Sequence, residues 1–220
     1  MKSKNKTLVN WIGLLGVVSF VSYAVAVIFT PLAYPGYDWM SRAVSDLSAT
    51  NAPSLARWHQ LSSLYGVAGI VCIMMVCVVI RDKWNKTLRI GIYLFAVMFW
   101  VSIVGYSWFP LSESGGTGTT FQDIMHIVVT AIIVPLSIAS FVLIMIGGYR
   151  KKRFISLAVF ATIALGLMFV GAIGTGIAPS EYFGVFQRFS NLISVNGFLA
   201  TLGLYLFWGK LDDKGSTACH

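Results

Sequence analysis

Six long apolar runs are the feature that most limits what this chain can fold into. They cover residues 8–33, 58–80, 88–109, 121–148, 154–177 and 183–208. A helix needs roughly 20 mostly apolar residues to cross about 30 Å of hydrocarbon, and each run is long enough. None of the runs alternates with period two as a barrel strand does, and backbone groups in lipid must be paired internally. The sequence therefore predicts an all-α polytopic membrane protein, a six-transmembrane-helix bundle that forms one integral membrane domain over residues 1–220.

The composition supports the bilayer as the solvent. Hydrophobic residues make up 57% of the chain and charged residues only 11%. That balance leaves too little polar surface to cover a soluble globule. The three cysteines are not spaced for a metal site, and we expect neither a disulfide nor a cysteine-bound metal.

Lys and Arg are distributed unevenly between the connections. Segments 2–6, 81–89, 150–153 and 210–214 hold 13 of the 16, which leaves Arg42, Arg57 and Arg188 on the other side. By the positive-inside rule, both termini are expected in the cytoplasm, in a multi-pass protein of the plasma (inner) membrane. The net charge of +8 then suits anionic lipid heads on the inner leaflet. Membrane lipids are therefore the expected partners, and nucleic acid is not.

The segment 34–63 is the one long polar stretch between apolar runs. Within 38–49, apolar or aromatic residues recur at close to helical spacing, which predicts a short amphipathic helix in the first outer loop. Residues 51–54 should end this helix and start the next span, with Ser54 as a candidate N-cap.

Polar side chains inside a membrane are costly, so their placement is informative. They gather near the outer ends of the even-numbered helices, where Asp123 and His126 share one helix face and Gln187 and Asn191 share another. If these faces converge, they line a polar cavity in the outer leaflet, to which the neighbouring segments add Arg42, Ser45, Asp46, His59 and Arg188.

Within such a cavity, Asp46 or Asp123 would pair with one of the arginines, Arg42 or Arg188. Each ion pair would lower the desolvation cost of both partners. The alternative is that these pairs serve only to pin the surface helix onto the bundle.

Metal and hydrolase chemistry both lack a supporting motif. Asp46, His59, Asp123 and His126 are of metal-ligating type, but no HxxxH or HExxH spacing is present, so we expect no metal and no cofactor. Ser45 or Ser41 with His126 and Asp123 supplies the residue types of a catalytic triad, but no GxSxG elbow fixes a nucleophile.

The stretch YPGYDWMSRAVSDLSATNAP, the six spans and a fourth helix that opens with Asp123-x-x-His126 resemble the bacterial and archaeal membrane family known as domain of unknown function 998. The resemblance covers residues 8–208 and implies the fold and the topology, without an activity. The family is more distantly similar to six-helix eukaryotic membrane proteins implicated in lipid handling, which implies a lipid role by analogy.

These observations favour a protein that binds or processes a lipid or another amphipathic small molecule in an outer-leaflet polar cavity. Arg42 and Arg188 would meet an anionic head group, and His126, oriented by Asp123, would act as hydrogen-bond partner or base. Two alternatives stay open. One is a membrane hydrolase or acyltransferase that uses His126, and the other is a non-catalytic scaffold or regulator that contacts partners through the helix face of Gly166 and Gly171.

Overall fold

The computed structural model describes residues 6–81, 83–113, 115 and 118–211. Six helical stretches are long and apolar enough to cross a membrane, and they run Leu8–Ala33, Leu55–Ile80, Lys86–Trp108, Phe121–Tyr149, Lys152–Ile177 and Ser180–Phe207. The described residues contain no strand. The predicted all-α fold with six spans is confirmed, and the chain is a multi-pass membrane protein.

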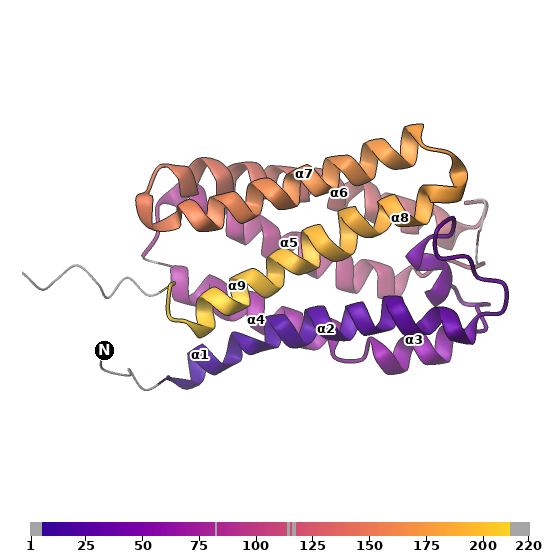
Figure 1. Ribbon diagram of the computed structural model, residues 1–220. Coiled ribbons are helices and arrows are strands. Elements are labelled where there is room, and N and C mark those ends of the chain that lie inside the picture. The colour runs from indigo at the N-terminus through magenta and orange to yellow at the C-terminus, as the bar shows by residue number, and fades with distance from the viewer. Residues whose placement is uncertain (1–5, 82, 114, 116–117, 212–220) are drawn as a thin grey trace, which may run out of the picture.

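The six spans are built from shorter elements that lie side by side as one bundle (Figure 1). The first span joins α1 (Leu8–Ile12), α2 (Leu14–Phe29) and η1 (Thr30–Ala33), and the second joins α3 (Leu55–Leu61) and α4 (Tyr65–Ile80). Two single helices follow, α5 (Lys86–Trp108) and α6 (Phe121–Tyr149). The last two spans contain η3 (Lys152–Phe154), α7 (Ile155–Ile177), η4 (Ser180–Tyr182), α8 (Phe183–Arg188), the π-helix η5 (Phe189–Asn196) and α9 (Gly197–Phe207).

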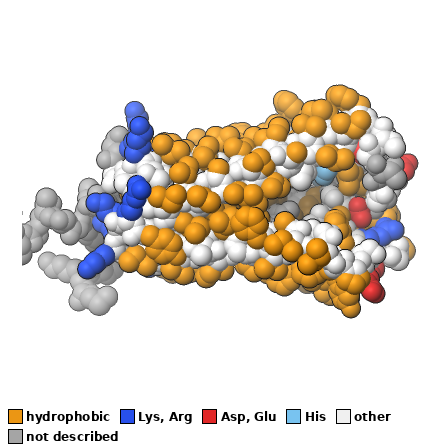
Figure 2. All heavy atoms as spheres, turned by 90° about the horizontal axis from the view of Figure 1, so that it is seen from above, with side chains coloured by type: hydrophobic (Ala, Val, Ile, Leu, Met, Phe, Trp, Pro, Cys, Tyr) orange, Lys and Arg blue, Asp and Glu red, His pale blue; other side chains and the backbone are white. Residues whose placement is uncertain are grey.

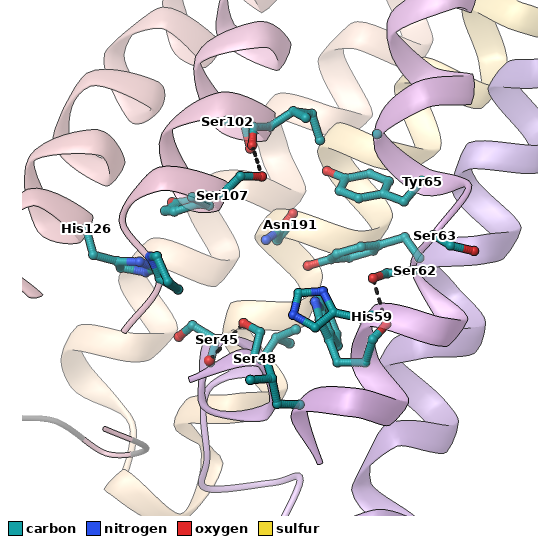
Figure 3. Close-up of a pocket in the computed structure, with 18 of the residues that line it drawn as sticks. Ser45, Ser48, His59, Ser62, Ser63, Tyr65, Ser102, Ser107, His126 and Asn191 are labelled. Carbon is teal, nitrogen blue, oxygen red and sulfur yellow. Dashed lines mark hydrogen bonds between the residues drawn. The ribbon is translucent and has the colours of Figure 1, made fainter. Parts of the chain in front are cut away.

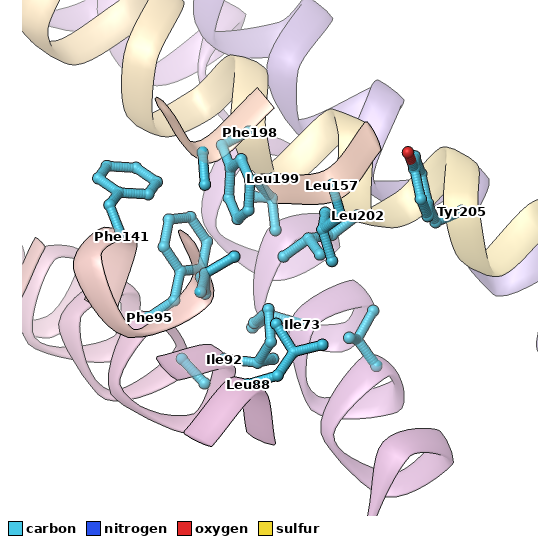
Figure 4. Close-up of a cluster of buried hydrophobic side chains, with 14 of the residues drawn as sticks. Ile73, Leu88, Ile92, Phe95, Phe141, Leu157, Phe198, Leu199, Leu202 and Tyr205 are labelled. Carbon is cyan, nitrogen blue, oxygen red and sulfur yellow. The ribbon is translucent and has the colours of Figure 1, made fainter. Parts of the chain in front are cut away.

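The packed centre of the bundle is aromatic. Phe95 of α5, Phe141 of α6 and Phe198 of α9 are buried, with ring centroids 5.2–5.9 Å apart (Figure 4). Such edge-on and tilted pairs add to the apolar area that each ring buries. Many large apolar side chains outside this centre are exposed and cover the sides of the bundle, as expected of a surface that faces lipid (Figure 2).

Glycines allow two pairs of spans to approach closely. A Cβ added to Gly203 of α9 would lie 2.3 Å from the carbonyl oxygen of Gly13, between α1 and α2. A Cβ on Gly171 of α7 would lie 2.6 Å from the Cβ of Ser190 in η5. Gly171 therefore packs inside the bundle, whereas a Cβ on Gly166 would meet nothing within 4 Å. The two residues do not form one face for a partner protein.

Irregular backbone interrupts the second and sixth spans. Between α3 and α4 the hydroxyl of Ser62 donates to the carbonyl of Trp58 (2.7 Å), and the amide of Tyr65 donates to the carbonyl of Ser62 (3.0 Å). In the sixth span the π-helix η5 separates α8 from α9. Backbone of this kind is tolerated at membrane depth where it is buried in protein or lines a cavity.

The helix predicted over 38–49 is wrong for its first half. Only η2 (Val44–Ser48), a 3₁₀-helix, forms, and within residues 38–43 the chain makes a turn at 39–41 and a bend at Arg42. The carboxylate of Asp38 accepts from the amide of Met40 (3.0 Å), and the Met40 carbonyl accepts from the amide of Val185 in α8 (3.1 Å). Because these backbone groups find partners outside a helix, apolar periodicity alone is not enough to form one.

Candidate functional site

A cavity of about 530 Å³ lies near the end of the bundle opposite the basic connections. Residues from α2, η2, α3, α4, α5, α6, α8 and η5 line it, so the first outer loop and every span except the fifth meet there. Figure 2 shows a hollow near the end with the acidic side chains, bordered by hydrophobic side chains and with a His side chain visible inside. The size is within the 300–1,000 Å³ usual for small-molecule sites.

Five of the nine predicted site residues line this cavity (Figure 3). They are Ser45, His59, His126, Gln187 and Asn191. The other four, Arg42, Asp46, Asp123 and Arg188, lie outside its lining.

The two arginines hold the first outer loop. Nη1 of Arg188 donates to the carbonyls of Trp39 (2.7 Å) and Arg42 (3.2 Å), and Nη2 donates to the hydroxyl of Tyr37 (2.9 Å). Burial raises the pKa of Tyr37, and its protonated hydroxyl donates to the carbonyl of Ala43 (2.8 Å). Nη1 of Arg42 donates to the hydroxyl of Tyr34 (3.0 Å). Both guanidinium groups thus bind residues of the loop, Arg188 through three hydrogen bonds besides a fourth to the carbonyl of Gly184 and Arg42 through one, and neither lines the cavity.

The two acidic residues bind the second outer loop, which connects α5 to α6 (109–120), and do not bind the arginines. Asp46 is buried and accepts from the amide of Gly115 (3.0 Å). Asp123 is also buried and accepts from the amide (2.8 Å) and the hydroxyl (2.7 Å) of Ser112. Among the described residues no carboxylate pairs with Arg42 or Arg188, so the predicted ion pairs are absent. The alternative of a structural role fits these four residues, with hydrogen bonds to loops in place of ion pairs.

His126 is oriented by a backbone carbonyl and not by Asp123. Its Nδ1 lies 2.8 Å from the carbonyl oxygen of Phe109, and its ring lies against that of Tyr106 with centroids 4.6 Å apart. A carbonyl oxygen can only accept, so Nδ1 carries the proton and Nε2 of the neutral ring is an acceptor. His126 therefore offers the cavity a lone pair in a fixed orientation.

The amide side chains of Gln187 and Asn191 supply hydrogen-bond donors to the cavity. Oε1 of Gln187 accepts from the amide of Val44 (2.8 Å), and Oδ1 of Asn191 accepts from Nδ2 of Asn196 (3.2 Å). With both oxygens occupied, the NH₂ groups of Gln187 and Asn191 are left for the cavity. Asn196 is fully buried, and its own side-chain oxygen has no partner among the described residues. It is a positioning residue for Asn191.

Sequence reasoning missed much of the lining, which is aromatic and hydroxylic. Tyr23 packs on Trp58 and Tyr65, with ring centroids 5.8 and 4.6 Å apart, and the hydroxyl of Tyr106 lies 2.9 Å from that of Thr130. Further hydroxyl groups come from Ser48, Thr50, Ser62, Ser63, Ser102 and Ser107. One available signal was the spacing of Ser102 and Tyr106, which share a face of α5 at i, i+4.

Among the residues that the structure describes, no Lys, Arg, Asp or Glu lines the cavity, and the titratable side chains of the lining are two histidines and three tyrosines. In the part of the chain that the structure describes, no three His, Cys, Asp or Glu residues come close enough to hold a metal ion. No described hydroxyl group hydrogen-bonds to the His126 ring, so the triad that the sequence offered is not assembled. The arrangement is a neutral polar site suited to hydrogen bonding.

Comparison with known proteins gives one match. The model of a family described as "Protein of unknown function (DUF998)" matches residues 17–205. The matched stretch contains both the first outer loop and the Asp123-x-x-His126 motif. No curated protein and no solved structure matches the chain.

Proposed function

The chain belongs to the DUF998 family, and we propose that it binds a lipid or another amphipathic small molecule in the polar cavity. The observation that carries the proposal is the cavity itself, about 530 Å³ of neutral polar space enclosed by apolar helices. Polar groups within a membrane span cost free energy unless they are paired, so a bundle that gathers hydroxyl, amide and imidazole groups around one space is suited to a polar ligand.

The route to the cavity supports a ligand from the bilayer. Five lining residues are also exposed and mark the mouth of the cavity: Thr50, His59, Ser63, Ser107 and Thr130. Three of them, Ser63, Ser107 and Thr130, lie on the membrane-spanning stretches. Their neighbours Leu64 and Trp108 are exposed by 57% and 73%, on surfaces of the kind that faces lipid. A molecule whose polar part fills the cavity can leave its apolar part in the hydrocarbon.

The basic connections support a placement in the outer leaflet of the plasma (inner) membrane. The described Lys and Arg residues of 81–89 and 150–153 lie at the end away from the cavity (Figure 2). By the positive-inside rule that end faces the cytoplasm, and both termini with it.

His126 favours one second candidate, a hydrolase or acyltransferase. His126 lines the cavity, and the bond of its Nδ1 to the Phe109 carbonyl leaves Nε2 as an acceptor, which is the kind of atom that a general base needs. In this candidate, the lipid would be cleaved or transferred rather than only held.

The test is mass spectrometry of molecules that stay bound after the detergent-purified protein has been incubated with total membrane lipid. Ser102→Phe fills the cavity, and Val97→Phe adds the same ring to α5 at a position that is 50% exposed. We expect wild type and Val97→Phe to retain a stoichiometric lipid and Ser102→Phe to lose it. Equal retention by all three proteins, or retention by none, contradicts the proposal. A lipid product that forms with wild type and not with His126→Ala would support the second candidate, a hydrolase or acyltransferase.

A further inference from the structure

We propose that the polar group held in the cavity is an uncharged, hydroxyl-bearing lipid head group, as in a diacylglycerol or a neutral glycolipid, and not the phosphate of a phospholipid. This inference rests on the proposed function and names the class of ligand. It replaces the anionic head group that Arg42 and Arg188 predict from the sequence.

The charge of the lining is the first reason. An anion in the cavity would be removed from water without a lysine or arginine to pair with, because among the described residues none lines the space. Arg42 donates to Tyr34, and Arg188 donates to three backbone carbonyls and to Tyr37. To reach an anion, the Arg188 guanidinium would have to give up its bonds to the loop, and Arg42 would have to leave Tyr34. A cationic head group would also lack an oppositely charged partner, because no carboxylate of the described residues lines the cavity.

The donors and acceptors of the lining are the second reason. The hydroxyl protons of Ser48, Ser62 and Ser107 are donated to the carbonyls of Ser45, Trp58 and Ile103, respectively. These oxygens therefore act as acceptors toward the cavity, as does Nε2 of His126. A phosphodiester oxygen only accepts, whereas a hydroxyl group donates, so the acceptors of the lining favour a ligand that carries hydroxyl groups.

The amide donors complete the match. The NH₂ groups of Gln187 and Asn191 need ligand acceptors, since their oxygens are bound to Val44 and Asn196. Ester carbonyl oxygens and hydroxyl oxygens both supply such acceptors. A pure hydrocarbon would leave every one of these groups unpaired, and a buried unpaired polar group is costly.

The experiment compares lipids that share the same acyl chains. Detergent-purified protein is mixed with diacylglycerol, monoglycosyl diacylglycerol or phosphatidylglycerol, and the bound fraction is measured by native mass spectrometry. Phosphatidylglycerol carries its free hydroxyl groups on a head-group glycerol that a phosphodiester joins to the diacylglycerol. Like the glycosyl lipid it therefore offers several head-group hydroxyl groups, but together with one negative charge. We expect phosphatidylglycerol to bind at least about tenfold more weakly than the better neutral lipid. Whichever neutral lipid binds more tightly shows whether the cavity prefers a diacylglycerol or a glycolipid head group.

A charge switch tests the same point within the cavity. Ser102→Lys places a cation in the lining, and Ser102→Met adds similar length without charge. We expect Ser102→Lys, and not Ser102→Met, to bind phosphatidylglycerol at least tenfold more tightly than wild type. If Ser102→Lys does not fold, Ser45→Lys supplies a cation from η2 instead.

The outcomes separate this inference from the proposed function. Tight binding of phosphatidylglycerol by wild type, blocked by Ser102→Phe, would overturn the uncharged head group and leave the lipid site standing. Failure of all three lipids to bind would overturn this inference, and the proposed function falls with it only if wild type also retains nothing from total membrane lipid.

Discussion

Gly184 in α8 gives a sharp test of how the first outer loop is held over the cavity. It is buried, and an added Cβ would lie 2.3 Å from the carbonyl oxygen of Arg42 and 2.5 Å from that of Trp39. Both carbonyl groups are acceptors for Nη1 of Arg188. Ordinary contact begins near 3.4 Å, so Gly184→Ala must push this backbone away by about 1 Å, which breaks or stretches both hydrogen bonds.

The expected cost follows from these contacts. Two hydrogen bonds from a charged donor contribute about 1.5 kcal/mol each when discounted for partial exposure, so their loss costs about 3 kcal/mol. Alanine in a helix returns at most about 1 kcal/mol relative to glycine. The docking of the loop should therefore weaken by about 2 kcal/mol, which is a factor of about 30 in the equilibrium between docked and open loop.

Hydrogen exchange reads this equilibrium directly. The amide of Val44 donates to Gln187 Oε1 and that of Val185 donates to the Met40 carbonyl, so both report loop docking. We expect their exchange in Gly184→Ala to be about 30-fold faster than in wild type. Gly166→Ala is the matched control, because its Cβ meets nothing within 4 Å, and it should leave both rates unchanged. Wild-type rates in Gly184→Ala would refute the docking that we describe.

Three further predictions concern the loops and the topology. Thr120→Ala removes the N-cap oxygen that accepts from the amide of Asp123, and this should cost about 1 kcal/mol of stability. The melting temperature in detergent should fall by about 2–4 °C. Thr175→Ala on α7 is the control and should lower the melting temperature less. Hydrogen bonds from the Ser41 hydroxyl and the Met40 amide hold the pKa of Asp38 below its ordinary value, so they stabilise the loop above about pH 4, and this contribution is lost as the pH falls below that range. Trp39 fluorescence should report this acid transition, and Asp38→Asn should remove it. In whole cells an impermeant thiol reagent should label Thr119→Cys and not Lys151→Cys, and labelling of Lys151→Cys alone would reverse the orientation.

The spans and part of the cavity were predictable because both follow from the cost of polar groups in lipid. Length and hydropathy were enough to place all six helices, and most ends agree within a few residues. The same cost made His126, Gln187 and Asn191 conspicuous within apolar runs, and all three line the cavity.

The partners of the charged side chains were not predictable in this way. Sequence reasoning paired Arg188 and Asp123 with opposite charges, because backbone carbonyls and amides are the same in every residue and carry no signal of their own. In the structure Arg188 binds carbonyls of the loop, and Asp123 accepts from Ser112. Tyrosines such as Tyr65 were overlooked because their rings fit the apolar pattern of a span while the hydroxyl group remains polar.

The most direct test of the lipid site is photo-crosslinking in proteoliposomes with a diacylglycerol that carries a diazirine on its first acyl carbons. Filling the cavity with Ser102→Phe should abolish labelling of the lining segments 58–66 and 102–110, whereas Val97→Phe should leave it intact. Unlabelled diacylglycerol should compete for these segments in wild type. Labelling confined to lipid-facing positions such as Val67 and Val97, and unchanged in Ser102→Phe, would contradict the assignment of the cavity as a lipid site.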